Sequence, residues 1–212
     1  WEQKYHAIHK QEYWNKEFVQ NKLRNDSDVN VSQSASTMID GNTAIQYWEK
    51  VPKKTLIIMK AMSKKSGLTP SSIFQSAFVL ALTYKSTSQF SYGTMSSGRT
   101  ALLGKVDSLC APLVRMLPVY FTWNPSQDTF MDLTIALQKK MLGNIEHEND
   151  ELFTGLGTLS AVFDFEPDKS FYNSDFVIEP VTTVDRIGYP LSVRISYDEN
   201  EECCKILTTS ED

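Results

Sequence analysis

The sequence predicts an α/β (α+β) sandwich, in which a mixed sheet is covered by helices on one side. Helical periodicity dominates the first third of the chain, and strand-like apolar runs bounded by turn residues dominate the rest. One long amphipathic segment interrupts the strand-like runs, so the predicted order is α–α–α–β–β–α–β–β–β–β. The 212 residues, 41% of them hydrophobic and 22% charged, are enough to bury one substantial core.

Three helices are expected first. Aromatic and aliphatic residues recur at helical spacing through residues 1–23, and the polar stretch 24–43 that follows is typical of a surface loop. The second helix, within 55–66, ends in Lys64 and Lys65 before Gly67, a common C-terminal signal. The third begins with Thr69 as its N-cap and Pro70 at its first position, and its apolar residues on nearly all sides predict a core helix.

The strands come next. Runs 90–95 and 113–123 predict two strands, and Pro118 inside the second indicates an edge position or a bulge. Residues 128–142 predict an amphipathic helix with Phe130, Leu133, Leu137 and Met141 on one face. Further strands are expected in the apolar segments 159–165, 175–181, 190–197 and 203–207.

Charge and cysteine content exclude several functions. A net charge of -5 argues against nucleic acid or an anionic membrane surface as a partner, and no apolar run reaches membrane-spanning length. Three cysteines are too few for a disulfide framework, and Cys203 and Cys204 point to opposite faces if they lie on a strand. We therefore expect a protein of the reducing cytoplasm. The opening Trp1 and the end in a strand-like run suggest a piece of a longer protein.

The histidines do not form a complete catalytic or metal-binding set. His6 and His9 have a spacing compatible with a metal, but nothing nearby completes the ligands, so a solvated helix face is the favoured interpretation. His147 could be a general base if an acid oriented it, and Glu146, Glu148 and Asp150 are its candidates. Such charge clusters are mostly solvated loops. Nucleophile-elbow, P-loop and dinucleotide-binding motifs are absent, so we predict no catalytic residue and no metal ligand in this chain.

The turn Ser96-Ser97-Gly98-Arg99 lies between the first two predicted strands. An arginine in a hydroxyl-rich turn could hold a phosphate, because guanidinium pairs well with its oxygens. It could also pin the turn to a carboxylate elsewhere in the fold, which is the interpretation we favour.

The order of these segments resembles the C-terminal lobe of condensation domains of nonribosomal peptide synthetases. That family has a "gvTps…aafalvLa" helix, a strand reading "vfGt..SGR" and a segment of the pattern "v.G.fintlPvR". Gly93, Ser97, Gly98, Arg99 and the Leu117-Pro118 pair match as they stand. Residues 13–18 ("YWNKEF"), 146–153 ("EHENDELF") and 185–199, with Arg186, Pro190 and Leu191, resemble further family segments in the same order. The resemblance covers nearly all of residues 1–212.

The resemblance implies a chloramphenicol acetyltransferase-like fold: two lobes enclosing a tunnel, with carrier proteins delivering phosphopantetheine-tethered substrates from opposite ends. The expected partners are the N-terminal lobe, acyl or peptidyl carrier proteins and adjacent synthetase domains. No cofactor is expected to bind directly, since phosphopantetheine comes with the carrier. The parent domain would form an amide or ester bond. The family's HHxxxDG motif, which belongs to the N-terminal lobe, is absent here, so this chain alone should not catalyse condensation.

By the same resemblance, the turn and the strand after it should line the tunnel or the lobe interface. The expected site residues are Gly93, Ser97, Gly98, Arg99, Arg115, Pro118 and Tyr120. The family usually has Gly and Asn where this chain has Ala111 and Arg115, and Arg where it has Tyr120. These departures keep two alternatives open: an inactive condensation-like scaffold or carrier-docking module, and a coenzyme A-dependent acyltransferase of the same superfamily.

Overall fold

The structure is a computed structural model that describes residues 13–14, 16–17, 45–83, 89–99, 110, 113–124, 128–148, 159, 161–167, 172–173, 176–177, 189–198 and 203–210. Most of the helix expected over 1–23 and all of the loop expected over 24–43 lie outside these residues. Within that helix, Tyr13, Trp14, Lys16 and Glu17 are helical, as expected. His6, His9 and Arg186 are also outside the described residues.

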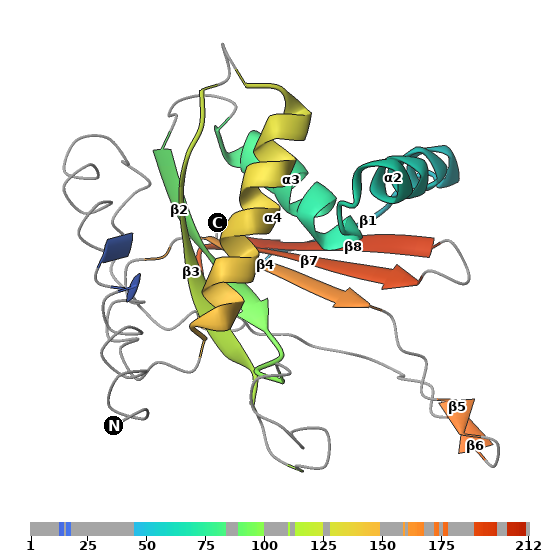
Figure 1. The fold of residues 1–212 in the computed structure, drawn as a ribbon. Coiled ribbons are helices and arrows are strands. Elements are labelled where there is room, and N and C mark those ends of the chain that lie inside the picture. The colour runs from blue at the N-terminus through green and yellow to red at the C-terminus, as the bar shows by residue number, and fades with distance from the viewer. Residues whose placement is uncertain are drawn as a thin grey trace.

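A six-stranded mixed sheet forms the centre of the fold, with the strand order β1-β8-β7-β4-β2-β3 (Figure 1). Its strands are β1 (Ile45–Lys50), β2 (Gln89–Ser96), β3 (Arg115–Thr122), β4 (Ala161–Pro167), β7 (Leu191–Asp198) and β8 (Cys203–Ser210). Strands β2, β4 and β7 run parallel, while the β2–β3, β7–β8 and β1–β8 pairs are antiparallel. The predicted mixed sheet is confirmed. Strand β3 ends the sheet, so Pro118 lies on an edge strand, where its missing N–H does not interrupt a central ladder.

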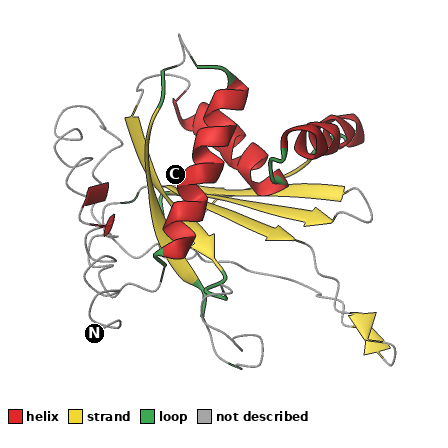
Figure 2. Cartoon of the chain, in the orientation of Figure 1, coloured by secondary structure: helices red, strands yellow, loops and turns green. Residues whose placement is uncertain are grey.

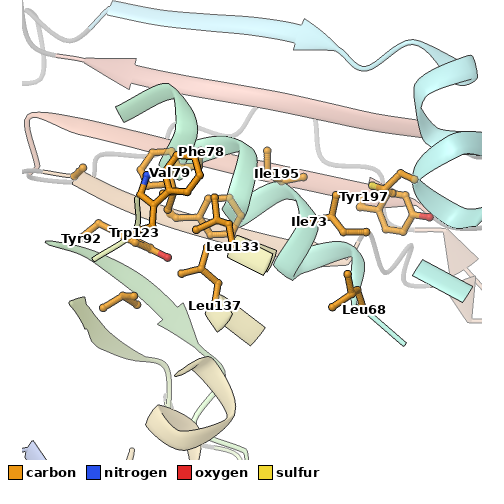
Figure 3. Packing of buried hydrophobic residues seen from close by; sticks show 14 of the residues in the cluster. Leu68, Ile73, Phe78, Val79, Tyr92, Trp123, Leu133, Leu137, Ile195 and Tyr197 are labelled. Atoms are coloured by element: carbon orange, nitrogen blue, oxygen red, sulfur yellow. The ribbon is translucent and has the colours of Figure 1, made fainter. Parts of the chain in front are cut away.

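Three helices cover one face of this sheet: α2 (Lys53–Ser66), α3 (Pro70–Thr83) and α4 (Phe130–Glu146). Helix α3 lies between the other two and contacts both, as Figures 1 and 2 show. The core lies between the helices and the sheet (Figure 3). At its centre the Phe78 ring contacts Tyr92 and Phe163, with ring centroids 5.3 and 5.5 Å apart. Burial of each such side chain contributes about 1.5–3 kcal/mol to the free energy of folding.

The joint between α2 and α3 follows the sequence signals. Gly67 adopts the left-handed conformation (φ 66°) that ends α2, and the Ser63 hydroxyl donates a hydrogen bond to the Leu68 carbonyl. The Thr69 hydroxyl accepts a hydrogen bond from the Ser72 N–H at 3.2 Å, so Thr69 caps α3 as predicted. Predicted and observed helix boundaries agree here because capping chemistry acts locally.

Several details differ from the predictions. Strand β1 forms in Ile45–Lys50, a segment that we had not assigned to any element. Of the strand expected over 175–181, the structure describes only Phe176–Val177, which form β6 and pair with β5 (Tyr172–Asn173), apart from the main sheet. Helix α4 extends to Glu146 rather than ending near 142. Helix α3 is not buried all round, because Ala77 and Ala81 are exposed.

Helix α4 begins with a reciprocal cap. The Thr129 hydroxyl accepts from the Asp132 N–H at 3.2 Å, and the Asp132 carboxylate accepts from the Thr129 N–H at 2.9 Å. The carboxylate also accepts from the Thr129 hydroxyl at 2.6 Å, and these bonds hold the pKa of Asp132 below its ordinary value. Within the described ranges, no helix has the length and apolar character needed to cross a membrane.

Candidate functional site: the SSGR corner

The SSGR corner, residues 96–99, turns the chain where β2 ends. Gly98 adopts φ 64°, and a Cβ on it would lie 1.9 Å from the Leu113 carbonyl oxygen. Any other residue here would combine left-handed strain with a backbone clash. The corner is thus pressed against the chain that leads into β3. Gly98 itself is buried, while Ser97 and Arg99 are exposed.

The two serines organise the turn through their hydroxyl groups. The Gly98 N–H donates to Ser96 Oγ at 3.4 Å, and the Arg99 N–H donates to Ser97 Oγ at 3.3 Å. Bonds from a backbone N–H to the hydroxyl two residues before it are typical of serine turns, which explains the hydroxyl-rich sequence.

A buried carboxylate fixes the corner from below. Ser96 Oγ donates to Glu148 Oε2 at 2.5 Å, and the Glu148 side chain is fully buried. The Arg115 guanidinium, at the start of β3, donates to the Glu148 backbone carbonyl at 3.1 Å. Glu148 therefore joins β2, β3 and the end of α4 at one point. Its Oε1 atom is buried and has no hydrogen-bond partner among the residues that the structure describes.

We had considered Glu148 only as an acid that could orient His147. In the structure the Glu148 carboxylate instead accepts a hydrogen bond from Ser96. The His147 ring stacks on the Tyr13 ring, with ring centroids 4.0 Å apart. The turn meets a carboxylate through the Ser96 hydroxyl. The pairing of Arg99 with a carboxylate, which we favoured, stays a prediction. No sequence signal distinguished Glu148 from its acidic neighbours, because its role depends on a partner 52 positions away.

A second set of contacts supports the middle of β3. Asn144, fully buried on α4, donates from Nδ2 to the Pro118 carbonyl at 3.0 Å and accepts from the Tyr13 hydroxyl at 2.7 Å. Trp14 Nε1 donates to the His147 carbonyl at 2.9 Å. The "YW" pair singled out in the sequence thus anchors the chain to the end of α4. Burial raises the pKa of the Tyr13 hydroxyl, so it remains a neutral donor.

The other expected site residues lie on the sheet itself. Gly93 pairs with Pro118 in the β2–β3 ladder, beside the Tyr92–Val119 pair. Since Tyr92 and Val119 belong to the core under the helices, strand alternation places Gly93, Pro118 and Tyr120 on the opposite face. A Cβ on Gly93 would lie 2.6 Å from the Met116 sulfur, so glycine allows that side chain to lie across the strand.

Tyr120 is an uncharged group at the position where the resemblance led us to note a missing arginine. Burial, with a smaller effect from the Glu17 carboxylate, raises the pKa of Tyr120 to about 12. It is therefore a neutral phenol at physiological pH.

The structure brings four of the seven expected residues into or beside the corner: Ser97, Gly98, Arg99 and Arg115. Gly93, Pro118 and Tyr120 follow along β2 and β3. Within the described part of the chain, no group of histidine, cysteine, aspartate and glutamate side chains could hold a metal ion. The corner is a polar junction, held by the hydrogen bonds of Ser96 and Arg115 to Glu148.

Comparison with known proteins identifies sequence relatives. No protein-family model matches the chain. It is 32% identical over 87 residues to nonribosomal peptide synthetase apmB of Penicillium brevicompactum, covering 41% of this chain and 4% of that protein. It is 24% identical over 157 residues to nonribosomal peptide synthetase ungA of Aspergillus violaceofuscus, covering 68% of this chain and 2% of that protein. The chain thus matches only a small part of these long relatives.

Solved structures share the fold. The condensation domain of the monacolin K polyketide synthase MokA superposes with a TM-score of 0.67 at 17% identity, covering 88% of this chain and 46% of that one. The EpoB cyclization-docking bidomain of Sorangium cellulosum gives 0.68 at 12% identity, covering 97% and 44%. The chain therefore has the fold that these condensation and cyclization domains share, and it is similar in sequence to parts of nonribosomal peptide synthetases.

Proposed function

We propose that the chain supplies one half of the substrate tunnel in a condensation domain, which joins two carrier-tethered acyl or aminoacyl groups through an amide or ester bond. The catalytic histidines would come from the N-terminal lobe. The phosphopantetheine arms would come from carrier proteins, in a multidomain synthetase of the cytoplasm.

The observation that carries this proposal is the way the SSGR corner is held. Ser96 binds the Glu148 carboxylate, and Gly98 lies close against the Leu113 carbonyl. Arg115, at the start of β3, binds the backbone carbonyl of the same Glu148. A corner built this tightly suits a positioning role. Holding two tethered reactants in a fixed geometry makes a bimolecular step nearly unimolecular, which is worth about 7–11 kcal/mol of the barrier.

The experiment mixes this chain with a separately expressed N-terminal lobe and two loaded carrier proteins. We expect the lobes to associate and to transfer the acyl group from one carrier to the other, whereas either lobe alone should be inactive. If the lobes associate without transfer, the catalytic version is wrong. Failure to associate at all would contradict the shared tunnel.

A second role has a specific observation in its favour. Arg115 makes a structural bond to the Glu148 carbonyl, and Tyr120 is neutral, so neither offers the groups that the family usually has at these positions. This combination favours a condensation-like scaffold that docks carrier proteins without catalysis. The double change Arg115→Asn and Tyr120→Arg in the full parent protein tests it. If an inactive parent gains transfer activity on this change, those two residues had disabled it; continued inactivity supports the scaffold.

The same mixture separates a coenzyme A-dependent acyltransferase from both roles. That enzyme would transfer an acyl group from coenzyme A to a diffusible acceptor when no carrier is present. Under the function proposed first, acyl transfer requires the carrier proteins. Transfer from coenzyme A without any carrier protein would therefore contradict that function and support the acyltransferase.

A further inference from the structure

Helix α2 concentrates positive charge on the surface of an acidic protein. Its sequence, KKTLIIMKAMSKKS, contains five lysines and no acidic residue, although the whole chain has a net charge of -5. Figure 1 shows α2 at the margin of the helical layer, on the far side of α3 from α4. Its outer side is therefore not covered by another helix of the described fold.

The outer side of α2 is also apolar at its centre. Leu56 and Met59 are buried in the core, whereas Ile57 and Ile58 remain 51% and 61% exposed. Two large β-branched side chains left in water have no role in the core of this lobe.

The helical repeat arranges these residues in a defined pattern. At about 100° per residue, Ile57, Ala61 and Ile58 fall in the middle of the exposed face. Two pairs of lysines share this face and lie at its two ends along the helix axis, Lys53 with Lys54 at the N-terminal end and Lys64 with Lys65 at the C-terminal end. We call these seven residues the α2 face.

The charge placement works against the helix at its N-terminal end, whereas Lys64 and Lys65 favour its C-terminal end. Lys53 and Lys54 lie in the first turn, at the positive end of the helix dipole, and Pro52 provides no side-chain cap. Helix α4, by contrast, begins with an acidic residue and a capping box. A surface that departs from local helix preferences, with no gain to the core, is the pattern expected where a partner binds.

We propose that the α2 face binds an acidic protein surface with apolar side chains at its centre, such as the amphipathic helix of a partner domain. Opposite charges at the two ends of the apolar strip would steer the partner, and the contact would bury Ile57 and Ile58. A second copy of the chain would bring lysines against lysines, which disfavours self-association. The net negative charge of the whole chain disfavours an anionic membrane. This inference concerns binding at α2 and goes beyond the transfer reaction proposed above.

The test uses the 212-residue chain and two synthetic helical peptides with the same leucine stripe, one flanked by glutamates and the other by lysines. Binding is followed by nuclear magnetic resonance titration at low and high salt. The glutamate peptide should shift α2 signals and bind more weakly as salt rises, because rim charges are screened. The lysine peptide should bind much more weakly or not at all.

Two pairs of variants assign the contact. The change Lys54→Glu, Lys64→Glu and Lys65→Glu should weaken binding of the glutamate peptide by about tenfold or more, whereas Lys139→Glu, an exposed lysine on α4, should not. Ile57→Ser with Ile58→Ser should likewise weaken binding, and Ile135→Ser, which is 51% exposed on α4, should not. Circular dichroism checks that each variant is folded. If the triple glutamate variant is not folded, Lys54→Gln with Lys64→Gln and Lys65→Gln takes its place.

Three outcomes would overturn the proposal. Equal binding of both peptides would show that charge does not select the partner. Peptide binding mapped away from α2 would place the surface elsewhere. The third outcome is that the glutamate peptide fails to bind while the same lysines and isoleucines are needed for another interaction. Cosedimentation with phosphatidylserine vesicles would then assign the α2 face to a membrane, and dimerisation would assign it to a second copy of the chain.

Discussion

The Ser96 hydroxyl donates a 2.5 Å hydrogen bond to the Glu148 carboxylate, which is fully buried at the end of α4. This bond joins two parts of the fold: the turn after β2 and the helix that covers β2 and β3. A carboxylate that is removed from water needs such donors, because an uncompensated buried charge is strongly destabilising.

Ser96→Ala should therefore destabilise the chain by about 1.5–3 kcal/mol, the usual contribution of a hydrogen bond to a charged group. Ser97→Ala is the matched control, since Ser97 is exposed and bonds only the Arg99 N–H among the contacts described here. Urea unfolding of the two variants provides the measurement. Equal midpoints would mean that the Ser96–Glu148 bond contributes nothing to stability.

Gly98 and Gly67 form a second matched pair, because both adopt positive φ but only one is crowded. Gly67→Ala introduces left-handed strain in open space, which costs about 1–2 kcal/mol. Gly98→Ala adds a Cβ 1.9 Å from the Leu113 carbonyl, so the corner must move as well. We expect Gly98→Ala to lower the unfolding midpoint clearly more than Gly67→Ala. In the parent protein it should also reduce acyl transfer, while Gly67→Ala should not.

The elements that the sequence predicted well are those set by local chemistry. Gly67, Thr69 and Pro70 determine the α2–α3 joint, and Pro118 indicates an edge strand, so each was correct without knowledge of the tertiary fold. Strand β1 was missed because its six residues pair only with β8, more than 150 residues away along the chain.

The candidate site was predicted only in part, because some of its residues carry a local signal and others depend on long-range contacts. Gly98 carries its own signal, since a glycine after two serines indicates a turn. Glu148 and Asn144 do not, because their importance comes from contacts with Ser96 and Pro118 that only the folded chain creates.

Asn144 leads to a third prediction. It is fully buried and joins the Tyr13 hydroxyl to the Pro118 carbonyl. Tyr13→Phe should cost about 0.5–1.5 kcal/mol, whereas Asn144→Ala should cost more, because each buried partner left unsatisfied adds about 1–3 kcal/mol. The double variant should be less destabilised than the sum of the two single variants, since both remove the same bond. Strict additivity in urea unfolding would indicate that the two residues act independently.

The reciprocal cap of α4 predicts a dependence of stability on pH. The bonds from Thr129 lower the pKa of Asp132, so in the folded chain this carboxylate binds its proton less readily than in the unfolded chain. The stability it provides is therefore fully present above its unfolded pKa, near 4, and is lost as the pH falls through the lower pKa of the folded state.

Asp132→Asn should consequently destabilise the chain at pH 7, and the difference in stability from the parent sequence should shrink with acidification. Thr129→Ala is the control: in that background the effect of Asp132→Asn should be smaller and less dependent on pH, because the hydroxyl bond is gone and only the backbone N–H of residue 129 still lowers the pKa. Thermal unfolding from pH 7 to pH 3 provides the measurement, and a constant difference over this range would contradict the role of the cap.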